Sequence, residues 1–143
     1  KYHRERAARG DDDRIYPWGN SAPNGVLANF SDGSLQSNFW MPDKSTNDGY
    51  AFLAPVGSYP SGASPFNVYD MAGNTWEWVS DWYSKSYYSS SPNDNPTGPT
   101  NGTTHVLKGG SFFQGKKNLR ISNRLPGDPN SPNDIYGFRC VWP

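Results

Sequence analysis

The chain has 143 residues, the length of one domain, and its 13 basic residues balance its 13 acidic residues at a pI near 6.9. This balance argues against nucleic-acid binding, which usually requires a basic excess, and no apolar run is long enough to span a membrane. The apolar fraction of 34% is low, but 6 Trp, 9 Tyr and 7 Phe can form a core, and 15 Gly with 13 Pro predict a turn-rich fold with little helix.

The first half of the chain contains one predicted helix and a long stretch without a periodic pattern. Residues 4–9 (RERAAR) predict the helix, which Gly10 can end as a C-cap before an acidic turn. Residues 16–20 (YPWGN) predict an aromatic turn. Residues 20–67 hold many prolines and glycines, so a bound metal ion or the packing of aromatic side chains must order them.

Strands are predicted in the second half. Residues 75–83 (TWEWVSDWY) alternate apolar and polar side chains, as a half-buried strand does, and a polar surface loop follows at 84–104. Residues 105–112 (HVLKGGSF) predict a strand with a glycine kink. Residues 118–124 predict another strand, and residues 136–141 predict a closing strand after a proline-rich loop.

Cysteine and histidine are too few for most metal sites. The single cysteine, Cys140, excludes an internal disulfide bond and a multi-cysteine zinc site within the chain. Its apolar neighbours predict a small buried side chain instead of a catalytic thiol. His3 and His105 lie far apart in the sequence and do not have the spacing of a metal site.

Four segments, taken in this order, resemble the formylglycine-generating-enzyme or sulfatase-modifying-factor family. They are AARG with YPWG at 7–19, YDMAGNTWEW at 69–78, VLKGGSF at 106–112 and GFRCV at 137–141. The resemblance implies a C-type-lectin-like α+β fold that is loop-rich, with small twisted antiparallel sheets and little helix. It also implies a single domain over residues 1–143 from which the family's usual N-terminal segment is absent.

The resemblance implies a first structural calcium site in the irregular first half. Calcium takes six to eight oxygen ligands from carboxylates, amides and backbone carbonyls, and such an ion orders backbone that lacks strand partners. Asn29 and Asp48 would bind through their side chains, and Phe30 and Tyr50 through their carbonyls.

A second calcium site is implied at residues 70–77. Asp70 and Glu77 would offer carboxylates, and Gly73 and Thr75 would offer carbonyls. Asp70 lies at a position where the family often has asparagine. The aspartate adds a negative charge there. The alternative is that Glu77 forms an ion pair with an arginine, for which the candidates are Arg120, Arg124 and Arg139.

The family's oxidation chemistry requires two cysteines that bind copper(I), since thiolates suit that soft ion. The resemblance puts the first of them at Gln114, and the second has no counterpart in this chain. Cys140 matches a different family cysteine, in the closing strand. We therefore do not expect formylglycine generation. Sulfoxide synthases of the same superfamily hold iron with several histidines, and two histidines are too few for that chemistry in this chain alone.

Without this oxidation chemistry, the scaffold could still bind a ligand. Residues 112–124 correspond to the family's substrate groove and to the hypervariable face of diversity-generating-retroelement variable proteins, and aromatic and adaptable polar side chains suit such a face. Phe112 favours the core, whereas residues 114–118 could be exposed or ligand-binding. Trp18, Trp76 and Trp82 could line a groove, although core packing is the commoner use of tryptophan. The predicted ligand-binding residues are Trp76, Phe112, Phe113, Gln114, Lys116, Lys117, Asn118, Arg120 and Arg124.

Two functions from different classes therefore stay open. The first is a non-catalytic, calcium-stabilised binding module for a protein, peptide or glycan. The second is an oxidoreductase-type member or enzyme subunit, completed by an N-terminal segment or a partner domain. A structural subunit of an envelope assembly is a variant of the first. Export or a cell-surface location is favoured over the cytoplasm, because calcium sites fill readily outside the cytosol.

Overall fold

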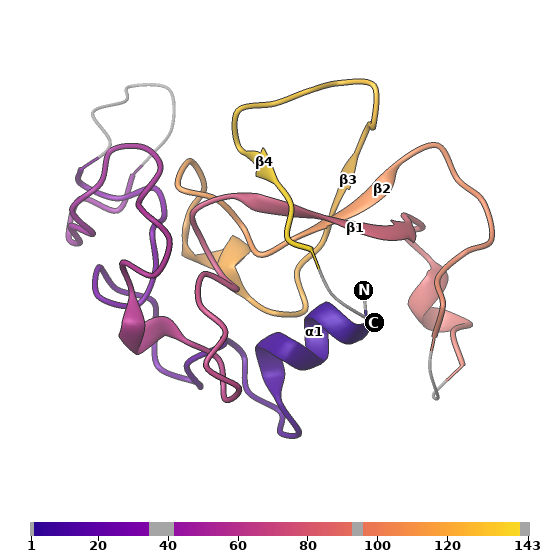
Figure 1. Cartoon of the computed structure of the whole chain (residues 1–143), viewed down its shortest axis with the longest axis horizontal. Coiled ribbons are helices and arrows are strands. Elements are labelled where there is room, and N and C mark those ends of the chain that lie inside the picture. Colours follow the sequence, from indigo (N-terminus) through magenta and orange to yellow (C-terminus); the bar gives the residue numbers. More distant parts are fainter. Residues whose placement is uncertain (1, 35–41, 93–95, 141–143) are drawn as a thin grey trace.

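The computed structural model describes residues 2–34, 42–92 and 96–140, which form one short helix, a small sheet and long loops. Figure 1 shows the helix below a curled sheet, with irregular loops at one end. The helix α1 spans Tyr2–Arg9, and the strands are β1 (Trp76–Trp82), β2 (His105–Lys108), β3 (Leu125–Gly127) and β4 (Tyr136–Gly137). Three short 3₁₀ helices lie at Pro60–Gly62, Tyr87–Ser89 and Lys116–Leu119. The predicted α+β, loop-rich fold is confirmed.

Helix α1 begins two residues before its predicted start and ends where the sequence indicated. Gly10 has a left-handed φ of 74°, and its N–H donates to the carbonyl of Arg6 over 2.8 Å. A glycine reaches this conformation without steric cost, so it terminates the helix. No helix in the described residues is long and apolar enough to cross a membrane.

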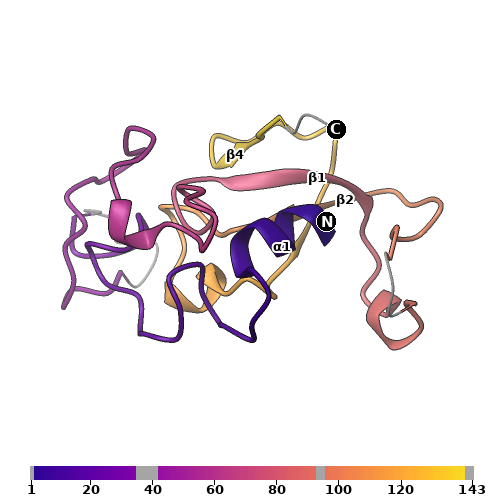
Figure 2. The same ribbon diagram turned by 60° about the horizontal axis from the view of Figure 1, so that its bottom comes forward.

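The sheet has the order β3-β2-β1-β4, with the predicted strand β1 near its centre. Strand β1 pairs antiparallel with β2, opposing Glu77 to Lys108 and Trp78 to Leu107. Strand β4 pairs parallel with β1, so the sheet is mixed, whereas small antiparallel sheets were expected. Helix α1 runs along one face of the sheet (Figure 2).

Three of the predicted strands differ from the structure. The strand predicted over 105–112 ends at Lys108, because Gly109 and Gly110 turn the chain with positive φ. Residues 118–124 do not form a strand; the 3₁₀ helix Lys116–Leu119 and a turn occupy that region, and the strand comes later, at β3. Pro126 lies within β3, which is possible because β3 is an edge strand and needs no N–H donor on its outer side. Only Tyr136–Gly137 of the closing strand is formed, and Val141 lies outside the described residues.

The core consists of small clusters of side chains around the sheet and the loops. Phe30, Ala28, Ala72 and Leu119 form one cluster, and Ala8, Met71 and Ile121 form another beneath α1. Cys140 is exposed, so the prediction that it is buried is wrong. The chain leaves the sheet after Gly137, and the neighbouring Phe138 is exposed as well.

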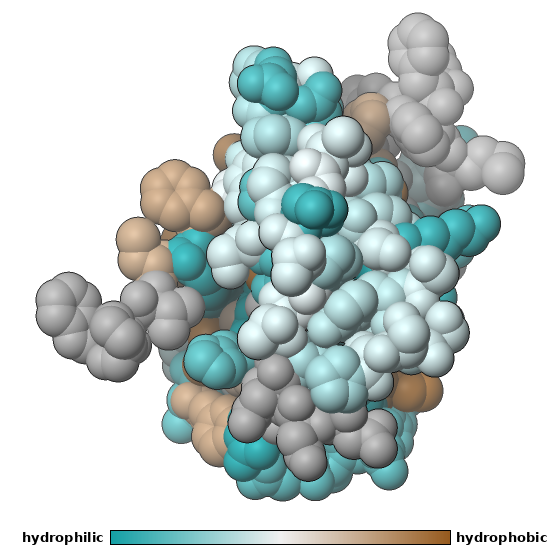
Figure 3. Space-filling view, turned by 90° about the vertical axis from the view of Figure 1, so that its right-hand side faces the viewer, coloured by the Kyte–Doolittle hydropathy of each residue, from teal (hydrophilic) through white to brown (hydrophobic). Residues whose placement is uncertain are grey.

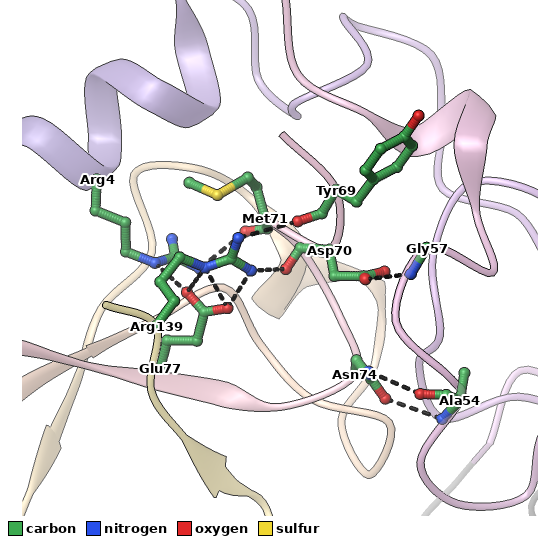
Figure 4. A network of polar contacts seen from close by, with 9 residues as sticks. All are labelled: Arg4, Ala54, Gly57, Tyr69, Asp70, Met71, Asn74, Glu77 and Arg139. Atoms are coloured by element: carbon green, nitrogen blue, oxygen red, sulfur yellow. Dashed lines mark hydrogen bonds and ion pairs between the residues drawn. The ribbon is translucent and has the colours of Figure 1, made fainter. Parts of the chain in front are cut away.

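Side-chain amides replace strand partners in the irregular loops. Asn74 accepts a hydrogen bond from the Ala54 N–H at 3.0 Å and donates to the Ala54 carbonyl at 3.1 Å, so it imitates a strand pair (Figure 4). Its own N–H donates to the Asn29 carbonyl over 2.9 Å. These contacts hold the loop around residue 54 and the segment around Asn29 against the start of β1.

The connection between β1 and β2 is polar, as predicted for residues 84–104. Viewed from this end, the surface is mainly hydrophilic or of intermediate hydropathy, with hydrophobic side chains at its margins (Figure 3). Arg124 holds the start of this connection, since its guanidinium donates to the carbonyls of Ser84 at 2.5 Å and Lys85 at 3.0 Å.

Replacing Gly127 with alanine is expected to destabilise the fold by about 1–3 kcal/mol, the usual cost of overpacking a core. A Cβ at Gly127 would lie 2.6 Å from the Trp78 ring and 2.8 Å from a methyl group of Leu107. Urea unfolding measures the change. The matched control is Gly115→Ala, where a Cβ would meet nothing within 4 Å; equal destabilisation by both variants would contradict this packing.

Candidate functional site

Asp48 connects two segments of the first predicted calcium site. One carboxylate oxygen accepts the Phe30 N–H at 2.9 Å, and the other accepts the Tyr50 N–H at 2.9 Å. The side chain is buried, and its backbone carbonyl accepts the Tyr59 hydroxyl at 3.2 Å. The structure therefore brings together Phe30, Asp48 and Tyr50, but through backbone N–H groups, and the Tyr50 carbonyl accepts the Ser34 hydroxyl at 2.8 Å.

A second buried carboxylate lies beside Asp48. Asp32 has 0% relative exposure, accepts the Asp48 N–H, and accepts the Ser34 hydroxyl at 2.6 Å. Burial raises the pKa of Asp48 and the negative charge of Asp32 adds to this rise, against hydrogen bonds that lower it. Neither carboxylate forms an ion pair within the described part of the chain. Sequence reasoning did not include Asp32, which carries no distinct motif.

Asn29, which precedes Phe30 in the sequence, has an unpaired side-chain oxygen. Its amide nitrogen donates to the Phe52 carbonyl at 2.7 Å and to the Asn74 side chain at 3.3 Å. Its amide oxygen is buried and has no hydrogen-bond partner. An unpaired buried acceptor is costly, and a cation would satisfy it.

Any cation bound at these oxygens would have few carboxylate ligands. The described residues contain no group of three or more His, Cys, Asp or Glu side chains that could hold a metal ion. A site at Asn29 and Asp48 would therefore depend on amide and carbonyl oxygens, which calcium accepts and softer metals bind less well.

Glu77 of the second predicted site is held by two arginines (Figure 4). Arg4 donates to one carboxylate oxygen at 2.7 Å, and Arg139 donates to both oxygens at 2.8 Å through Nε. Arg139 also forms an ion pair with Glu77 through a terminal nitrogen. The arginine alternative for Glu77 thus describes the structure, with Arg139 as one partner and Arg4 as a partner that the sequence did not suggest.

The carboxylate of Asp70 points away from Glu77 and accepts the Gly57 N–H at 2.8 Å (Figure 4). Gly73 and Thr75 lie in the bend between these two residues, where the Gly73 N–H donates to the Gly109 carbonyl. The structure does not bring the Asp70 and Glu77 carboxylates together, and two guanidinium groups already neutralise Glu77. The residues of the second predicted site therefore do not fit a metal ion.

Some members of the predicted ligand-binding face are buried. Trp76 has 0% relative exposure, and its indole N–H donates to the Gln114 amide oxygen at 3.1 Å. Phe112 is buried too, which agrees with the core alternative for that residue. Both support the face from beneath instead of contacting a ligand.

Two cations of the predicted face form contacts within the protein. Lys116 pairs with Asp43, whose pKa this hydrogen bond lowers, and its amine lies 5.6 Å from the Phe30 ring centre. Arg124 stacks between Tyr83 and Tyr88, at 4.9 and 4.3 Å from their ring centres. These charges stabilise loops.

The predicted face also has members that are partly or fully exposed to solvent, among them Phe113, Gln114, Lys117 and Arg120. Asn118 accepts a hydrogen bond from the Asn123 side chain at 3.1 Å. Phe113 packs edge-to-face against Phe112, with 6.2 Å between ring centres.

Sequence reasoning missed Phe52, which also packs against Phe112, at 6.0 Å, and is 68% exposed. We call Phe52, Phe112 and Phe113 the aromatic edge.

Comparisons with known proteins agree with this fold. The model of the Sulfatase-modifying factor enzyme 1-like domain family matches residues 1–143. The formylglycine-generating enzyme of Streptomyces coelicolor is 39% identical over 146 residues, which cover 96% of this chain and 43% of that enzyme.

Solved structures with the same fold include two bacterial proteins. PvdO from Pseudomonas aeruginosa superposes with a TM-score of 0.74 at 26% identity, covering 95% of this chain and 48% of PvdO. Variable protein 1 of Treponema denticola superposes with a TM-score of 0.71 at 22% identity, covering 94% of this chain and 43% of that protein. The chain thus spans less than half the length of each of these proteins.

Proposed function

The chain belongs to the Sulfatase-modifying factor enzyme 1-like domain family, and from this premise we propose that it is a non-catalytic, calcium-stabilised binding module. Its ligand-binding face lies around residues 112–124. Because the chain spans less than half of the Streptomyces enzyme, that enzyme's activity does not transfer with the family.

The cysteine content supports a non-catalytic role. The copper-dependent oxidation in formylglycine-generating enzymes uses two thiolates that bind copper(I). The sequence of this chain has one cysteine, the exposed Cys140. At the position of the first copper ligand, Gln114 accepts a hydrogen bond from Trp76 and thereby fixes the loop. A copper site with two thiolates would need a cysteine from outside residues 1–143.

The proposed calcium ion is structural. Asn29 and Asp48 would bind it through side-chain oxygens, and Phe30 and Tyr50 through their carbonyls. The unpaired amide oxygen of Asn29 supports this assignment. The ion would neutralise the buried Asp32 and Asp48 carboxylates and order loops that lack strand partners. Such sites fill readily outside the cytosol, so we propose an exported or cell-surface location.

The exposed Phe52 resting on Phe112 is the observation that carries the binding role. An exposed aromatic side chain on a supported surface is typical of a recognition site. Lys117 and Arg120, both exposed, add positive charge to the proposed face at residues 112–124. A peptide or protein segment with apolar and acidic side chains is the ligand that this combination favours.

A peptide-display selection against the purified chain tests the binding role. We expect enriched peptides that bind the wild-type chain and lose about 2 kcal/mol, roughly 30-fold in affinity, with Phe52→Ala. The control is Phe66→Ala, because Phe66 is also exposed, at 54%, and makes no ring contact with the aromatic edge. Peptides that bind Phe52→Ala as tightly as wild type would contradict the proposed face.

The second candidate function is an enzyme subunit completed by another domain. The 39% identity to a formylglycine-generating enzyme is the observation in its favour. Incubating the chain with copper and a cysteine-containing peptide, followed by mass spectrometry, separates the two functions. Conversion of the peptide's cysteine to formylglycine by this chain alone would overturn the non-catalytic role.

A further inference from the structure

A pocket lies between strand β1 and the β3–β4 connection, and its lining includes no residue of the aromatic edge. Its volume is about 540 Å³, within the usual range for small-molecule sites. In Figure 1 the β3–β4 connection rises beside β1 as a wide arch. The side chains that matter for the argument are Trp78, Ser80, His105, Asn133 and Tyr136.

Close packing fixes the aromatic walls of the pocket. The Trp78 ring lies against Gly127, where a Cβ would be only 2.6 Å away, and Tyr136 packs on it edge-to-face at 5.5 Å. His105 stacks on Trp82 with 3.9 Å between ring centres, and its Nδ1 lies 3.1 Å from the Ser80 carbonyl. The rings are therefore positioned before any ligand arrives, which reduces the entropy cost of binding.

Several polar groups around these rings have no partner in the described part of the chain. No hydrogen bond there uses the indole N–H of Trp78, the phenol of Tyr136 or the hydroxyl of Ser80. Asn133 accepts the Ile135 N–H with its amide oxygen at 3.1 Å, which leaves its amide nitrogen free to donate. Two of these four groups are hydroxyls, which both donate and accept.

The lining contains no lysine, arginine, aspartate or glutamate among the described residues. A charged ligand would thus lose hydration without gaining an opposite charge, so the lining favours a neutral ligand. Flat aromatic surfaces next to neutral donors and acceptors match a molecule with an apolar ring face and a rim of hydroxyl groups.

We propose that this pocket binds a neutral saccharide. One sugar ring would pack on Trp78 and Tyr136, and its hydroxyls would pair with Ser80, Asn133 and the free N–H and O–H groups of the two rings. A proline-rich peptide could pack on the same rings, but its prolines offer carbonyl acceptors and no donors. It would leave the acceptor capacity of the two hydroxyls unused.

Nuclear magnetic resonance of the tryptophan indole N–H groups tests this site. The probes are cellobiose, maltose and N,N′-diacetylchitobiose, and Trp78→Phe assigns the Trp78 signal. We expect at least one disaccharide to shift this signal saturably. Ser80→Arg, which fills the pocket with a charged side chain, should weaken binding at least about tenfold. Ser61→Arg is the control, because Ser61 is exposed and does not line the pocket.

A second variant keeps the test decisive if Ser80→Arg fails to fold in a thermal melt. Asn133→Asp retains the oxygen that accepts the Ile135 N–H, removes the amide donor and adds a negative charge, so it should also weaken binding about tenfold. The proposal is overturned if no disaccharide shifts the Trp78 signal at its highest soluble concentration. It is also overturned if the folded pocket variants bind as tightly as wild type, or if only a proline-rich peptide shifts the signal.

Discussion

Replacing Glu77 with glutamine is expected to destabilise the fold by about 3–5 kcal/mol, the usual cost of breaking a buried ion pair. The relative exposure of the side chains is 9% for Arg4 and 7% for Glu77. Burial lowers the pKa of Arg4, and Glu77 opposes this by stabilising the charged guanidinium. Without the carboxylate, Arg4 would remain as a buried positive charge beside Arg139.

The same change would loosen several segments of the chain. Arg4 belongs to α1 and also donates to the Met71 carbonyl at 3.1 Å. Arg139 comes from the segment after β4 and donates to the carbonyls of Tyr69 at 3.2 Å and Asp70 at 3.1 Å. Glu77 thus joins the helix, the loop at 69–71 and the last described segment to β1 (Figure 4).

Urea unfolding of the Glu77→Gln variant measures this effect. Asp12→Asn is the matched control, since Asp12 pairs with Arg14 at the surface at 2.6 Å. An exposed pair of this kind contributes about 0–1 kcal/mol. If Glu77→Gln cost no more than Asp12→Asn, the two arginines would not depend on Glu77, and its central role would be refuted.

Removing calcium is expected to lower the melting temperature of the wild-type chain by about 5–10 °C. A ligand at about 100 times its dissociation constant stabilises a fold by about 2.7 kcal/mol. Each kcal/mol corresponds to about 2–4 °C for domains near this size. Thermal melts with and without a calcium chelator measure the difference.

The variant Asp48→Asn locates this effect. An amide offers a weaker ligand than a carboxylate and leaves one of the two backbone N–H groups at Phe30 and Tyr50 poorly paired, so the variant should melt lower than wild type even without calcium. The decisive quantity is the decrease in melting temperature that the chelator causes. This decrease should vanish in Asp48→Asn. Asp134→Asn, at an exposed position, should retain it. A chelator effect that survives in Asp48→Asn would place the ion elsewhere.

The sequence predicts the local features of this fold well. The alternation around Trp76 and Trp78 predicts β1, and Gly10 predicts the end of α1, because each depends on neighbouring residues. The sequence fails where distant contacts decide the structure. Residues 118–124 could form a strand, but β3 occupies the edge of the sheet instead.

The candidate site divides in the same way. The family resemblance brings together Asn29, Phe30 and Asp48, which the structure also places in one region. Of the two partners of Glu77, Arg139 was among the candidates from the sequence. Arg4 could not be foreseen, because it lies 73 residues away and no local pattern connects it to Glu77. Phe52 was missed for a similar reason, since its exposure depends on how its loop rests on Phe112.

The metal content of the purified chain tests the central claim most directly. Elemental analysis for calcium, copper and iron is made on the wild-type chain and on Asp48→Asn after equilibration with calcium. A calcium-stabilised, non-catalytic module should hold one calcium ion per wild-type chain, none in Asp48→Asn, and no stoichiometric copper or iron. Copper or iron in stoichiometric amount, or a wild-type chain that holds no calcium, would contradict the account.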